Sequence, residues 1–255
     1  MQVDLGGRVA IVTGSGNLRG IGATYARALA EQGAAVVVAD VNDAGATSVA
    51  EQLRSEGLSA VAHATDITDR ESVRSVMERA RDEFGGVDIL VNNAALMADM
   101  EMSPVYSYPY EEWDRVLSVN LTGAFNCCHE AVPFMQERDG GKIVNQSSGG
   151  AFPPQGVYGI TKLGVVALTV ALAKELGGFK INVNAIAPGH VVTEASEKIA
   201  PEGSDFHKMI MDAAPRGGSN HPEALVGALL LLVSPDGDWI TGQTLNVDGG
   251  WVTRT

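Results

Sequence analysis

Short apolar runs alternate with longer stretches of helical spacing along the whole chain. The run at 35–39, Ala-Val-Val-Val-Ala, has no polar alternation, which is typical of a strand covered on both faces. Such runs predict strands at 8–13, 35–39, 59–64, 87–91, 142–146, 180–186 and 243–247. The stretches between them predict helices at 22–32, 43–56, 69–84, 110–138, 157–176 and 222–233, the longest of them bent or broken near Pro133.

Strands and helices in alternation build βαβ units and a parallel sheet. We therefore predict an α/β fold, with a seven-stranded, doubly wound parallel sheet and helices on both faces. A single domain over residues 1–255 is expected, because no linker rich in Pro, Gly or Ser divides the chain. Residues 190–219 interrupt the rhythm with Gly, Pro and mixed charge, which is typical of a ligand lid at the carboxyl edge of such a sheet.

Composition narrows the classes of function. The chain has 18 Lys and Arg against 31 Asp and Glu, and the resulting charge of −13 argues against a nucleic-acid partner. Adjacent Cys127 and Cys128 cannot easily reach disulfide geometry, so we interpret them as core residues in a reducing compartment. We see neither a signal peptide nor an 18-residue apolar run, and expect a cytoplasmic protein without a membrane span. The five histidines show no ligand spacing, so no metal is expected.

A glycine-rich turn follows the first predicted strand. Its sequence is Thr13-Gly14-Ser15-Gly16-Asn17-Leu18-Arg19-Gly20-Ile21-Gly22. Such a turn lets the backbone approach a pyrophosphate, and the next helix points its first N–H groups at the anion. The position between strand and helix therefore predicts a Rossmann-type dinucleotide site.

Polar residues also end the next strands. Asp40, 18 residues beyond Gly22, can accept hydrogen bonds from both adenosine ribose hydroxyls, or cap the next helix, a role that Asn42 or Asp43 could supply instead. Asp66 can bind an adenine amino group or cap a helix. The fourth strand ends in residues that leave room for a ligand and can tie loops together, namely Asn92-Asn93-Ala94-Ala95.

Tyr158 and Lys162 lie four residues apart on a predicted helix and therefore share one face. Lowering a phenol pKa from about 10 to about 7 requires roughly 4 kcal/mol. A lysine ammonium one turn away, together with a cationic nicotinamide ring, is a plausible source. The phenol could then exchange a proton with a carbinol or carbonyl.

With these residues in place, the chain resembles the classical short-chain dehydrogenases/reductases over essentially its whole length. The residues that carry the resemblance are Thr13-Gly14, Asn92-Asn93-Ala94, Asn120, Ser148, Tyr158, Lys162, Pro188-Gly189 and the ending Asn246-Val-Asp-Gly-Gly250.

The resemblance implies a catalytic role for four residues. Tyr158 would be the general acid/base, and Lys162 would bind the nicotinamide ribose and lower the tyrosine pKa. Ser148, rather than its neighbour Ser147, would hydrogen-bond the substrate oxygen. Asn120 would hold a proton-relay water, although a structural role at a helix bulge is the alternative.

The expected cofactor contacts combine the strand ends with positions that the resemblance implies. They are Gly14, Ser15, Asn17, Leu18, Arg19, Gly20, Ile21, Asp40, Val41, Asp66, Ile67, Asn93, Ala94, Ala95, Tyr158, Lys162, Pro188, Gly189, Val191 and Thr193.

Three departures from the family pattern stand out. Five residues separate Gly14 from Gly20, where three are usual, so the glycine loop is lengthened. Ser148 precedes Tyr158 by ten residues instead of the common twelve or thirteen, which shortens the loop between them. Ala95 replaces a glycine after the fourth strand.

We therefore expect an NAD-dependent oxidoreductase that transfers a hydride between nicotinamide and a secondary alcohol or ketone, and we expect the alcohol to be cyclic or aryl-substituted. The alternative is an NADPH-dependent 3-oxoacyl thioester reductase. Asp40 favours NAD, whereas Arg19 is the kind of basic residue that family members using NADP often carry. A non-enzymatic dinucleotide sensor could lose Tyr158 or Lys162, but both are present. Candidates for an apolar substrate pocket are Met97, Met102, Phe152, Pro153, Met209 and Met211.

We also expect a homotetramer. Residues 226–233, Val-Gly-Ala-Leu-Leu-Leu-Leu-Val, are apolar all round, and the ending 241–251 resembles the segment through which these proteins pair subunits. The alternative is a helix buried wholly within one subunit.

Overall fold

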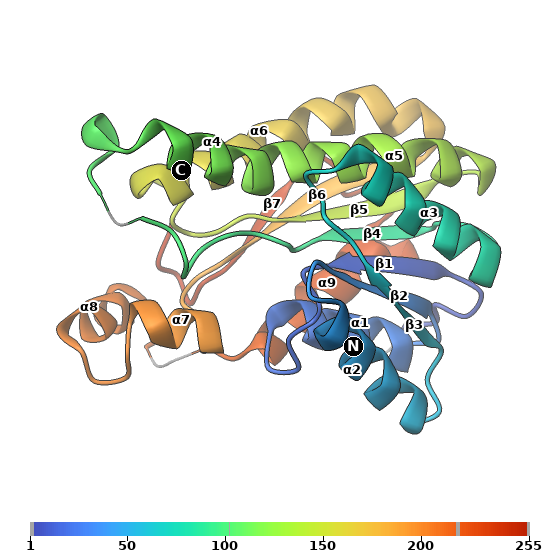
Figure 1. Ribbon diagram of the computed structural model, residues 1–255, viewed down its shortest axis with the longest axis horizontal. Helices are drawn as coiled ribbons and strands as arrows, with labels where there is room; N and C mark the ends of the chain where they lie inside the picture. Colours follow the sequence, from blue (N-terminus) through green and yellow to red (C-terminus); the bar gives the residue numbers. More distant parts are fainter. Residues whose placement is uncertain (1–2, 102, 218–219, 254–255) are drawn as a thin grey trace.

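The computed structural model describes residues 3–101, 103–217 and 220–253, and it contains one seven-stranded parallel sheet (Figure 1). The strand order is β3-β2-β1-β4-β5-β6-β7, which confirms the predicted doubly wound α/β fold. The strands are β1 (Val9–Thr13), β2 (Ala35–Asp40), β3 (Ala60–Ala64), β4 (Ile89–Asn92), β5 (Gly141–Gln146), β6 (Ile181–Pro188) and β7 (Thr244–Val247).

Most helices follow the predicted segments, but the helix predicted at 110–138 is divided into three elements, and two further helices lie within 194–213, where none was predicted. The helices are α1 (Ile21–Glu31), α2 (Asp43–Ser55), α3 (Arg70–Phe84), α4 (Tyr110–Leu117), α5 (Ala124–Glu137), α6 (Gly156–Leu176), α7 (Glu194–Ile199), α8 (Asp205–Ala213) and α9 (Val226–Val233). Shorter helical turns are η1 (Val105–Ser107), η2 (Ser118–Gly123), η3 (Gly177–Phe179), η4 (Pro222–Leu225) and η5 (Pro235–Gly237).

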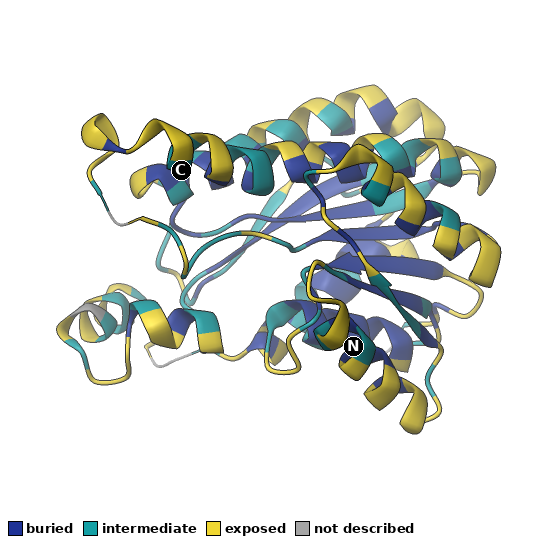
Figure 2. Cartoon of the chain, in the orientation of Figure 1, coloured by how far each residue is buried: buried dark blue, intermediate teal, exposed yellow. Residues whose placement is uncertain are grey.

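The sheet is buried on both faces, as the continuous apolar runs predict. All five residues of β1 are buried (Figure 2). One cluster of buried side chains joins α1, α2 and α9 to one face, and a second cluster joins α3, α5 and α6 to the other. Apolar burial of this kind is the main stabilising contribution to the fold, at roughly 25 cal/mol per Å².

The helix is not broken near Pro133, although a break is one of the two predicted outcomes. Pro133 lies inside α5, which continues to Glu137, and the irregular segment is instead the π-helical turn η2. A proline inside a helix removes one N–H donor, and α5 accommodates that loss. The π turn contains Asn120, one of the predicted catalytic residues.

Among the described residues, one helical stretch, Gly156–Phe179, is long and apolar enough to cross a membrane by length and composition. It is α6 with the turn η3, and α6 packs against β6 and carries the buried Lys162. These contacts identify α6 as a core helix of the α/β fold.

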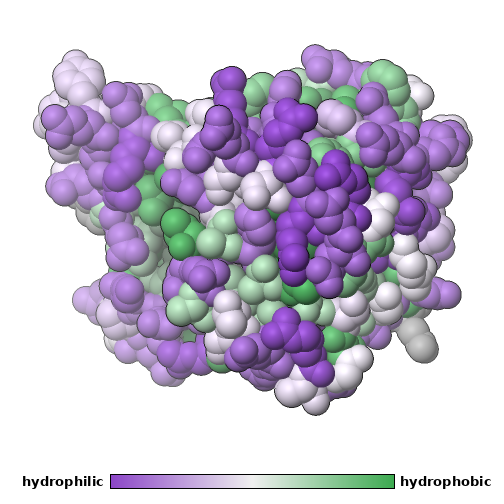
Figure 3. Space-filling view, turned by 45° about the vertical axis from the view of Figure 1, so that its right-hand side comes forward, coloured by the Kyte–Doolittle hydropathy of each residue, from purple (hydrophilic) through white to green (hydrophobic). Residues whose placement is uncertain are grey.

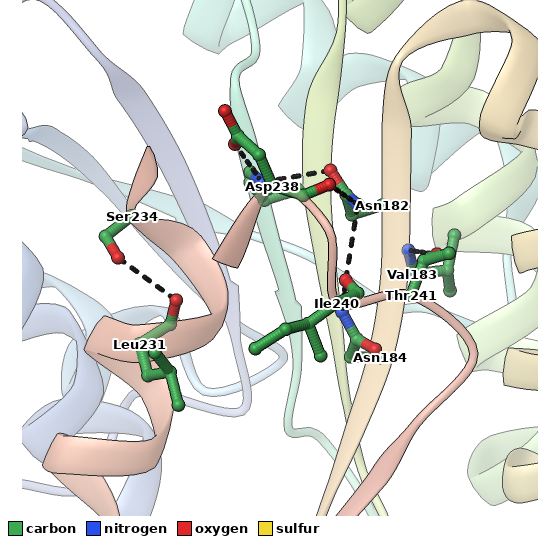
Figure 4. A network of polar contacts seen from close by, with 9 residues as sticks. Asn182, Val183, Asn184, Leu231, Ser234, Asp238, Ile240 and Thr241 are labelled. Atoms are coloured by element: carbon green, nitrogen blue, oxygen red, sulfur yellow. Dashed lines mark hydrogen bonds and ion pairs between the residues drawn. The ribbon is translucent and has the colours of Figure 1, made fainter. Parts of the chain in front are cut away.

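Hydrogen bonds from β6 fix the connection into the last strand (Figure 4). Asn182 Nδ2 donates to the carbonyl oxygens of Asp238 at 2.9 Å and Ile240 at 3.2 Å, and Asn184 Nδ2 donates to Ile240 at 2.7 Å. Val183 N donates to the Thr241 hydroxyl at 3.1 Å. Side chains of one strand thus hold the loop that positions β7 at the edge of the sheet.

The predicted excursion after β6 forms the helices α7 and α8. In Figure 1 these two helices stand beyond the carboxyl ends of the strands, away from the helices that cover the sheet. An isolated bridge between Val191 and Asn220 connects the beginning and the end of this segment.

Candidate active site

Tyr158 and Lys162 lie together on the first turns of α6. The Lys162 side chain is buried, and its Nζ donates to the main-chain oxygen of Gln146, at the end of β5, at 2.9 Å. The same Nζ lies 5.7 Å from the centre of the Tyr158 ring. The structure therefore brings the predicted pair to one face of α6, beside the carboxyl end of β5.

Burial changes the proton affinities of both groups. It raises the pKa of Tyr158 to about 12, against a smaller lowering by a hydrogen bond with Ser148. It lowers the pKa of Lys162 to about 8. Among the protein residues, desolvation of Tyr158 outweighs the influence of Ser148 on its pKa, and the expectation that Lys162 and a cationic nicotinamide together lower that pKa stays a prediction.

The two adjacent serines have different partners. Ser147 is buried, and its hydroxyl donates to the main-chain oxygen of Lys162 at 3.0 Å. Ser148 accepts a hydrogen bond from Gly150 N at 3.1 Å, and its hydroxyl is close enough to Tyr158 to lower the pKa of that phenol. This geometry favours Ser148 over Ser147 as the serine that meets a substrate oxygen.

Asn120 lies in the π turn η2 and is only 1% exposed. Its Oδ1 accepts from Leu96 N at 2.7 Å, and its Nδ2 donates to Leu96 O at 3.0 Å and to Thr161 Oγ1 at 3.2 Å. Asn120 thus ties the segment after β4 to α6. Its side chain performs the structural role considered above, and the proton-relay role stays a prediction.

The glycine loop approaches its surroundings too closely for side chains. A Cβ on Gly14, which has a φ of +64°, would lie 2.6 Å from the Ala94 Cα, and a Cβ on Gly22 would lie 2.3 Å from the Gly14 oxygen. Asn93 Nδ2 donates to the main-chain oxygens of Thr13 at 3.1 Å and Gly14 at 2.8 Å. The residues that end β1 and β4 therefore form a tight backbone cradle, as a pyrophosphate site requires.

Asp40 is tied to the glycine loop and does not cap a helix. Its Oδ2 accepts from Gly16 N at 2.7 Å and its Oδ1 from Asn42 N at 2.9 Å. Asn42 caps α2 by accepting from Gly45 N at 3.2 Å. A carboxylate at this strand end, next to the cradle, fits an adenosine ribose, so the residues present fit a dinucleotide.

The neighbouring candidates differ in exposure. Asp69 caps α3, which leaves Asp66 exposed and bonded to Thr68 N and Oγ1 at 2.9 and 2.7 Å. Val41 is exposed. Ile67 is buried and packs directly against Gly123.

The predicted lid, which covers residues 190–219, begins among the residues expected to meet the nicotinamide. Pro188 ends β6, Gly189 lies against Asp248, and Val191 is buried. Thr193 caps α7 by accepting from Ser196 N at 3.2 Å. These residues lie at the carboxyl edge of the sheet, as predicted.

A contact between the glycine loop and the lid was not predicted. Glu194 Oε2, on the first turn of α7, accepts from Asn17 Nδ2 at 3.1 Å and lies 3.7 Å from an Arg19 nitrogen. Glu194 and Asn17 are 177 residues apart, so no local pattern could have indicated their contact.

The predicted apolar pocket is brought together only in part. Met211 lines a cavity between α8 and the segment after β7, whereas Met209 is exposed. Met102 lies outside the described residues. The described residues contain no group of three or more His, Cys, Asp and Glu that could hold a metal ion.

Comparisons with known proteins found similarity over almost the whole chain. The model of a family described as "Enoyl-(Acyl carrier protein) reductase" matches residues 14–252. An uncharacterized oxidoreductase of Mycobacterium tuberculosis is 44% identical over 97% of this chain and 98% of its own length. D-threitol dehydrogenase of Mycolicibacterium smegmatis is 35% identical over 98% of the chain and 95% of its own length, and a 3-oxoacyl-[acyl-carrier-protein] reductase of Thermotoga maritima is 35% identical over 97% and 99%.

A solved structure from Sinorhizobium meliloti, described as a "putative short-chain alcohol dehydrogenase", has a TM-score of 0.90. It is 36% identical and covers 97% of both chains. The fold and the comparisons define a nicotinamide-dependent oxidoreductase. The chain belongs to the short-chain dehydrogenase/reductase family.

Proposed function

We propose that the chain is an NAD-dependent dehydrogenase that oxidises a cyclic or aryl-substituted secondary alcohol to a ketone, and reduces the ketone in reverse. The observation that carries the choice of cofactor is the Asp40 carboxylate, which lies at the end of β2 against Gly16. A 2′-phosphate near that carboxylate would be repelled by roughly 3 kcal/mol per pair of unit charges at 5 Å and an effective dielectric of about 20. It would also displace the ribose hydroxyls from Asp40.

The contact between Arg19 and Glu194 supports the same choice. Arg19 is the basic residue that would favour binding of NADP, and its guanidinium lies 3.7 Å from the carboxylate of Glu194 on the lid. Glu194 thereby offsets the positive charge that a 2′-phosphate would need.

The contacts of the candidate residues support the following roles. When bound, the nicotinamide supplies the hydride acceptor. The Tyr158 hydroxyl exchanges a proton with the substrate oxygen, which Ser148 holds by a hydrogen bond. Lys162 would hold the nicotinamide ribose, and its ammonium group beside a cationic nicotinamide would lower the tyrosine pKa that burial raises.

The test is a panel of secondary alcohols with NAD and with NADP, read by the absorbance of the reduced cofactor. We expect turnover with NAD and a higher kcat/KM than with NADP. The alternative, a reductase of 3-oxoacyl thioesters, is supported by the acyl-carrier-protein relative and by the family description. A preference for NADPH of tenfold or more, with turnover of a 3-oxoacyl thioester, would establish that alternative.

We also propose a homotetramer in the cytoplasm. Helix α9 buries most of its apolar side chains within the subunit, namely Leu229, Leu230, Leu232 and Val233. Its apolar sequence is therefore weaker support for a tetramer than expected. Better support comes from β7, which ends the sheet with all four residues half-buried, and from exposed apolar side chains of α5 and α6 such as Phe125 and Val170. The two free cysteines are buried, as suits a reducing compartment.

Light scattering at micromolar concentration should give four times the chain mass of 26.7 kDa. A monomer mass would contradict the proposal. Val170→Glu should lower the mass without unfolding the subunit, because Val170 is 38% exposed in the single chain.

A further inference from the structure

The hydroxyl group of Tyr25 is buried beneath the glycine loop and bonded to the end of β5. Tyr25 lies on the second turn of α1, is 0% exposed, and donates to Gln146 Oε1 at 3.0 Å. Its ring belongs to the apolar cluster that joins α1, α2 and α9 to the sheet. Burial raises the pKa of the phenol, so the hydroxyl stays protonated and remains a donor. Because an unbonded hydroxyl would be costly in these surroundings, this bond fixes the side chain of Gln146.

Gln146 connects the two halves of the candidate site. Its side chain is bonded to α1, the helix that follows the glycine loop. Its main-chain oxygen accepts from Lys162 Nζ at 2.9 Å, and Ser148 follows two residues later in the chain. A dinucleotide that reaches from the backbone cradle to Tyr158 and Lys162 therefore passes Gln146.

The second arm of the Gln146 amide has unused hydrogen-bonding capacity. Oε1 is held by Tyr25, whereas Nε2 has no hydrogen-bond partner among the described residues. Gln146 is 7% exposed, and Nε2 is not among the unpartnered atoms that are sealed from solvent. Since Gln146 is the last residue of β5, Nε2 meets solvent at the carboxyl edge of the sheet.

This edge of the sheet offers space for a ligand. In Figure 3 a recess on the left side of the molecule shows hydrophobic residues inside and hydrophilic residues around it. An amide N–H group needs an acceptor oxygen, and a dinucleotide carries such oxygens along its whole length. A nearly buried donor at the edge of the cradle therefore fits the cofactor.

The position of Gln146 in the sheet decides which half of the cofactor it meets. Asp40, the residue expected to hold the adenosine ribose, ends β2, and the order β2-β1-β4-β5 places Gln146 three strands away. Three steps of about 4.8 Å separate the two strand ends by roughly 14 Å. Lys162, the residue expected to hold the nicotinamide ribose, is in direct contact with Gln146. The oxygens nearest to Gln146 therefore belong to the nicotinamide half.

We propose that Gln146 binds the nicotinamide half of the cofactor through Nε2, and that Tyr25 is a positioning residue that holds the amide in the required orientation. Neither residue is among the cofactor contacts expected from the sequence. The inference rests on the cofactor site of the proposed function and adds two residues to it. It applies equally to NADH and NADPH, because the two cofactors share their nicotinamide half.

The test measures binding to the whole protein without substrate, for NADH and NADPH by fluorescence and for AMP by calorimetry. Gln146→Leu removes the donor and keeps a side chain of similar size. It should weaken binding of both dinucleotides by about three- to tenfold, the size of one net hydrogen bond. AMP carries only the adenosine half, so its affinity should not change.

Tyr25→Phe tests the positioning role, because it removes only the hydroxyl that orients the amide. It should weaken NADH binding by about threefold in the wild type and have no further effect in the Gln146→Leu background, where no amide remains to be oriented. The double variant exchanges both bonded partners for apolar side chains, which keeps the fold if a single variant unfolds. Tyr108→Phe is the matched control, since Tyr108 is also buried but its hydroxyl has no partner among the described residues. It should leave all three affinities unchanged.

The outcomes separate this proposal from the dehydrogenase function. An NADH affinity that Gln146→Leu leaves unchanged overturns the role of Gln146, as does equal weakening of NADH and AMP, which would show a general disturbance of the site. Additive effects of the two substitutions overturn the positioning role of Tyr25. Wild-type protein that binds the dinucleotides but oxidises no alcohol contradicts the dehydrogenase function alone, and wild-type protein that binds neither contradicts both. Thermal unfolding checks that each variant is folded.

Discussion

The buried residues around α6 and the exposed contact between the glycine loop and the lid use charge in opposite ways. At α6, Lys162 is 2% exposed and donates to a main-chain oxygen at 2.9 Å. At the contact between loop and lid, the side chains of Arg19 and Glu194 are 74% and 49% exposed and lie 3.7 Å apart. The first region keeps one unpaired ammonium away from water, and the second pairs two solvated charges.

This difference decides how much each residue can change. In a region of low dielectric, removing water from a charged group shifts its pKa and costs stability, and small displacements change reactivity. An exposed ion pair is screened and contributes at most about 1 kcal/mol. We therefore expect the buried residues to govern rate and stability, and the exposed pair to adjust cofactor choice.

The largest effect is expected for Tyr158→Phe. The change keeps the ring, whose centre lies 5.7 Å from Lys162 Nζ, but removes the hydroxyl whose pKa the neighbouring Ser148 lowers. Loss of a general acid/base lowers the rate by about 10² to 10⁴. Steady-state kcat should fall by that factor, while the dissociation constant for reduced cofactor, measured by fluorescence, should stay nearly the same.

Tyr106→Phe is the control for this experiment, because Tyr106 is 93% exposed on the turn η1. It should leave kcat unchanged. A Tyr158→Phe enzyme within a few-fold of the wild-type rate would remove Tyr158 from the mechanism.

Lys162→Met should abolish activity and stabilise the fold at the same time. Burial lowers the pKa of Lys162 from 10.5 to about 8, so at pH 7 the folded protein holds an ammonium group that the unfolded chain solvates better. Relief of that cost is worth up to about 3 kcal/mol, at roughly 1.36 kcal/mol per pKa unit. Urea unfolding at pH 7 should therefore show a higher free energy for the variant.

The stability advantage of Lys162→Met should depend on pH. Above pH 10.5 the lysine is neutral in both states and carries no penalty. As the pH falls from 10.5 to 8, the unfolded chain binds the proton first, and the wild type loses stability. The advantage of Lys162→Met should therefore be largest below pH 8 and shrink above it. Lys174→Met, an exposed position on α6, should show no such dependence, and equal stability of wild type and Lys162→Met at pH 7 would contradict the prediction.

Asp40 is half-buried, so its exposure lies between that of the buried Lys162 and that of the exposed pair of Arg19 and Glu194. Asp40→Ala should narrow the preference for NAD over NADP by about 10- to 100-fold, because it removes both the ribose acceptor and the repulsion of a 2′-phosphate. It also removes the acceptor of Gly16 N. Asp40→Asn keeps an acceptor there, and should narrow the preference with less loss of overall affinity.

The ratio of kcat/KM values for the two cofactors is the readout, and Asp43→Asn is a charge-matched control on α2. If Asp43→Asn changes the ratio as much as Asp40→Asn does, Asp40 acts only through net charge. A ratio that Asp40→Ala leaves unchanged would remove Asp40 from cofactor selection.

The sequence allowed the buried strands to be predicted almost to the residue, because runs such as 35–39 are apolar on both faces. Local patterns failed where a distant contact decides the structure. The π turn at Asn120 is tied to Leu96, 24 residues away, whereas Pro133 produced no break despite its strong local preference. The bond between Tyr25 and Gln146 joins residues that are 121 positions apart, which no local spacing in the chain encodes.

The smallest effect is expected at the exposed pair, where Glu194→Gln should raise kcat/KM for NADP by up to about fivefold and leave NAD nearly unchanged. The amide can still accept from Asn17 Nδ2, so the contact between loop and lid is kept while the charge that offsets Arg19 is removed. The size follows from the roughly 1 kcal/mol that an exposed ion pair can contribute. Glu197→Gln, an exposed position on the same helix, changes the net charge equally and should not affect the ratio.

The gain must also require Arg19, since the proposed effect of Glu194 is exerted on that guanidinium. In the double variant Arg19→Ala/Glu194→Gln the improvement with NADP should vanish, and added salt should reduce it in the single variant, because the charges are solvated. Equal loss of activity with both cofactors in Glu194→Gln would show that the residue only holds the lid. An improvement that persists without Arg19 would show that Glu194 repels the 2′-phosphate directly, as Asp40 does.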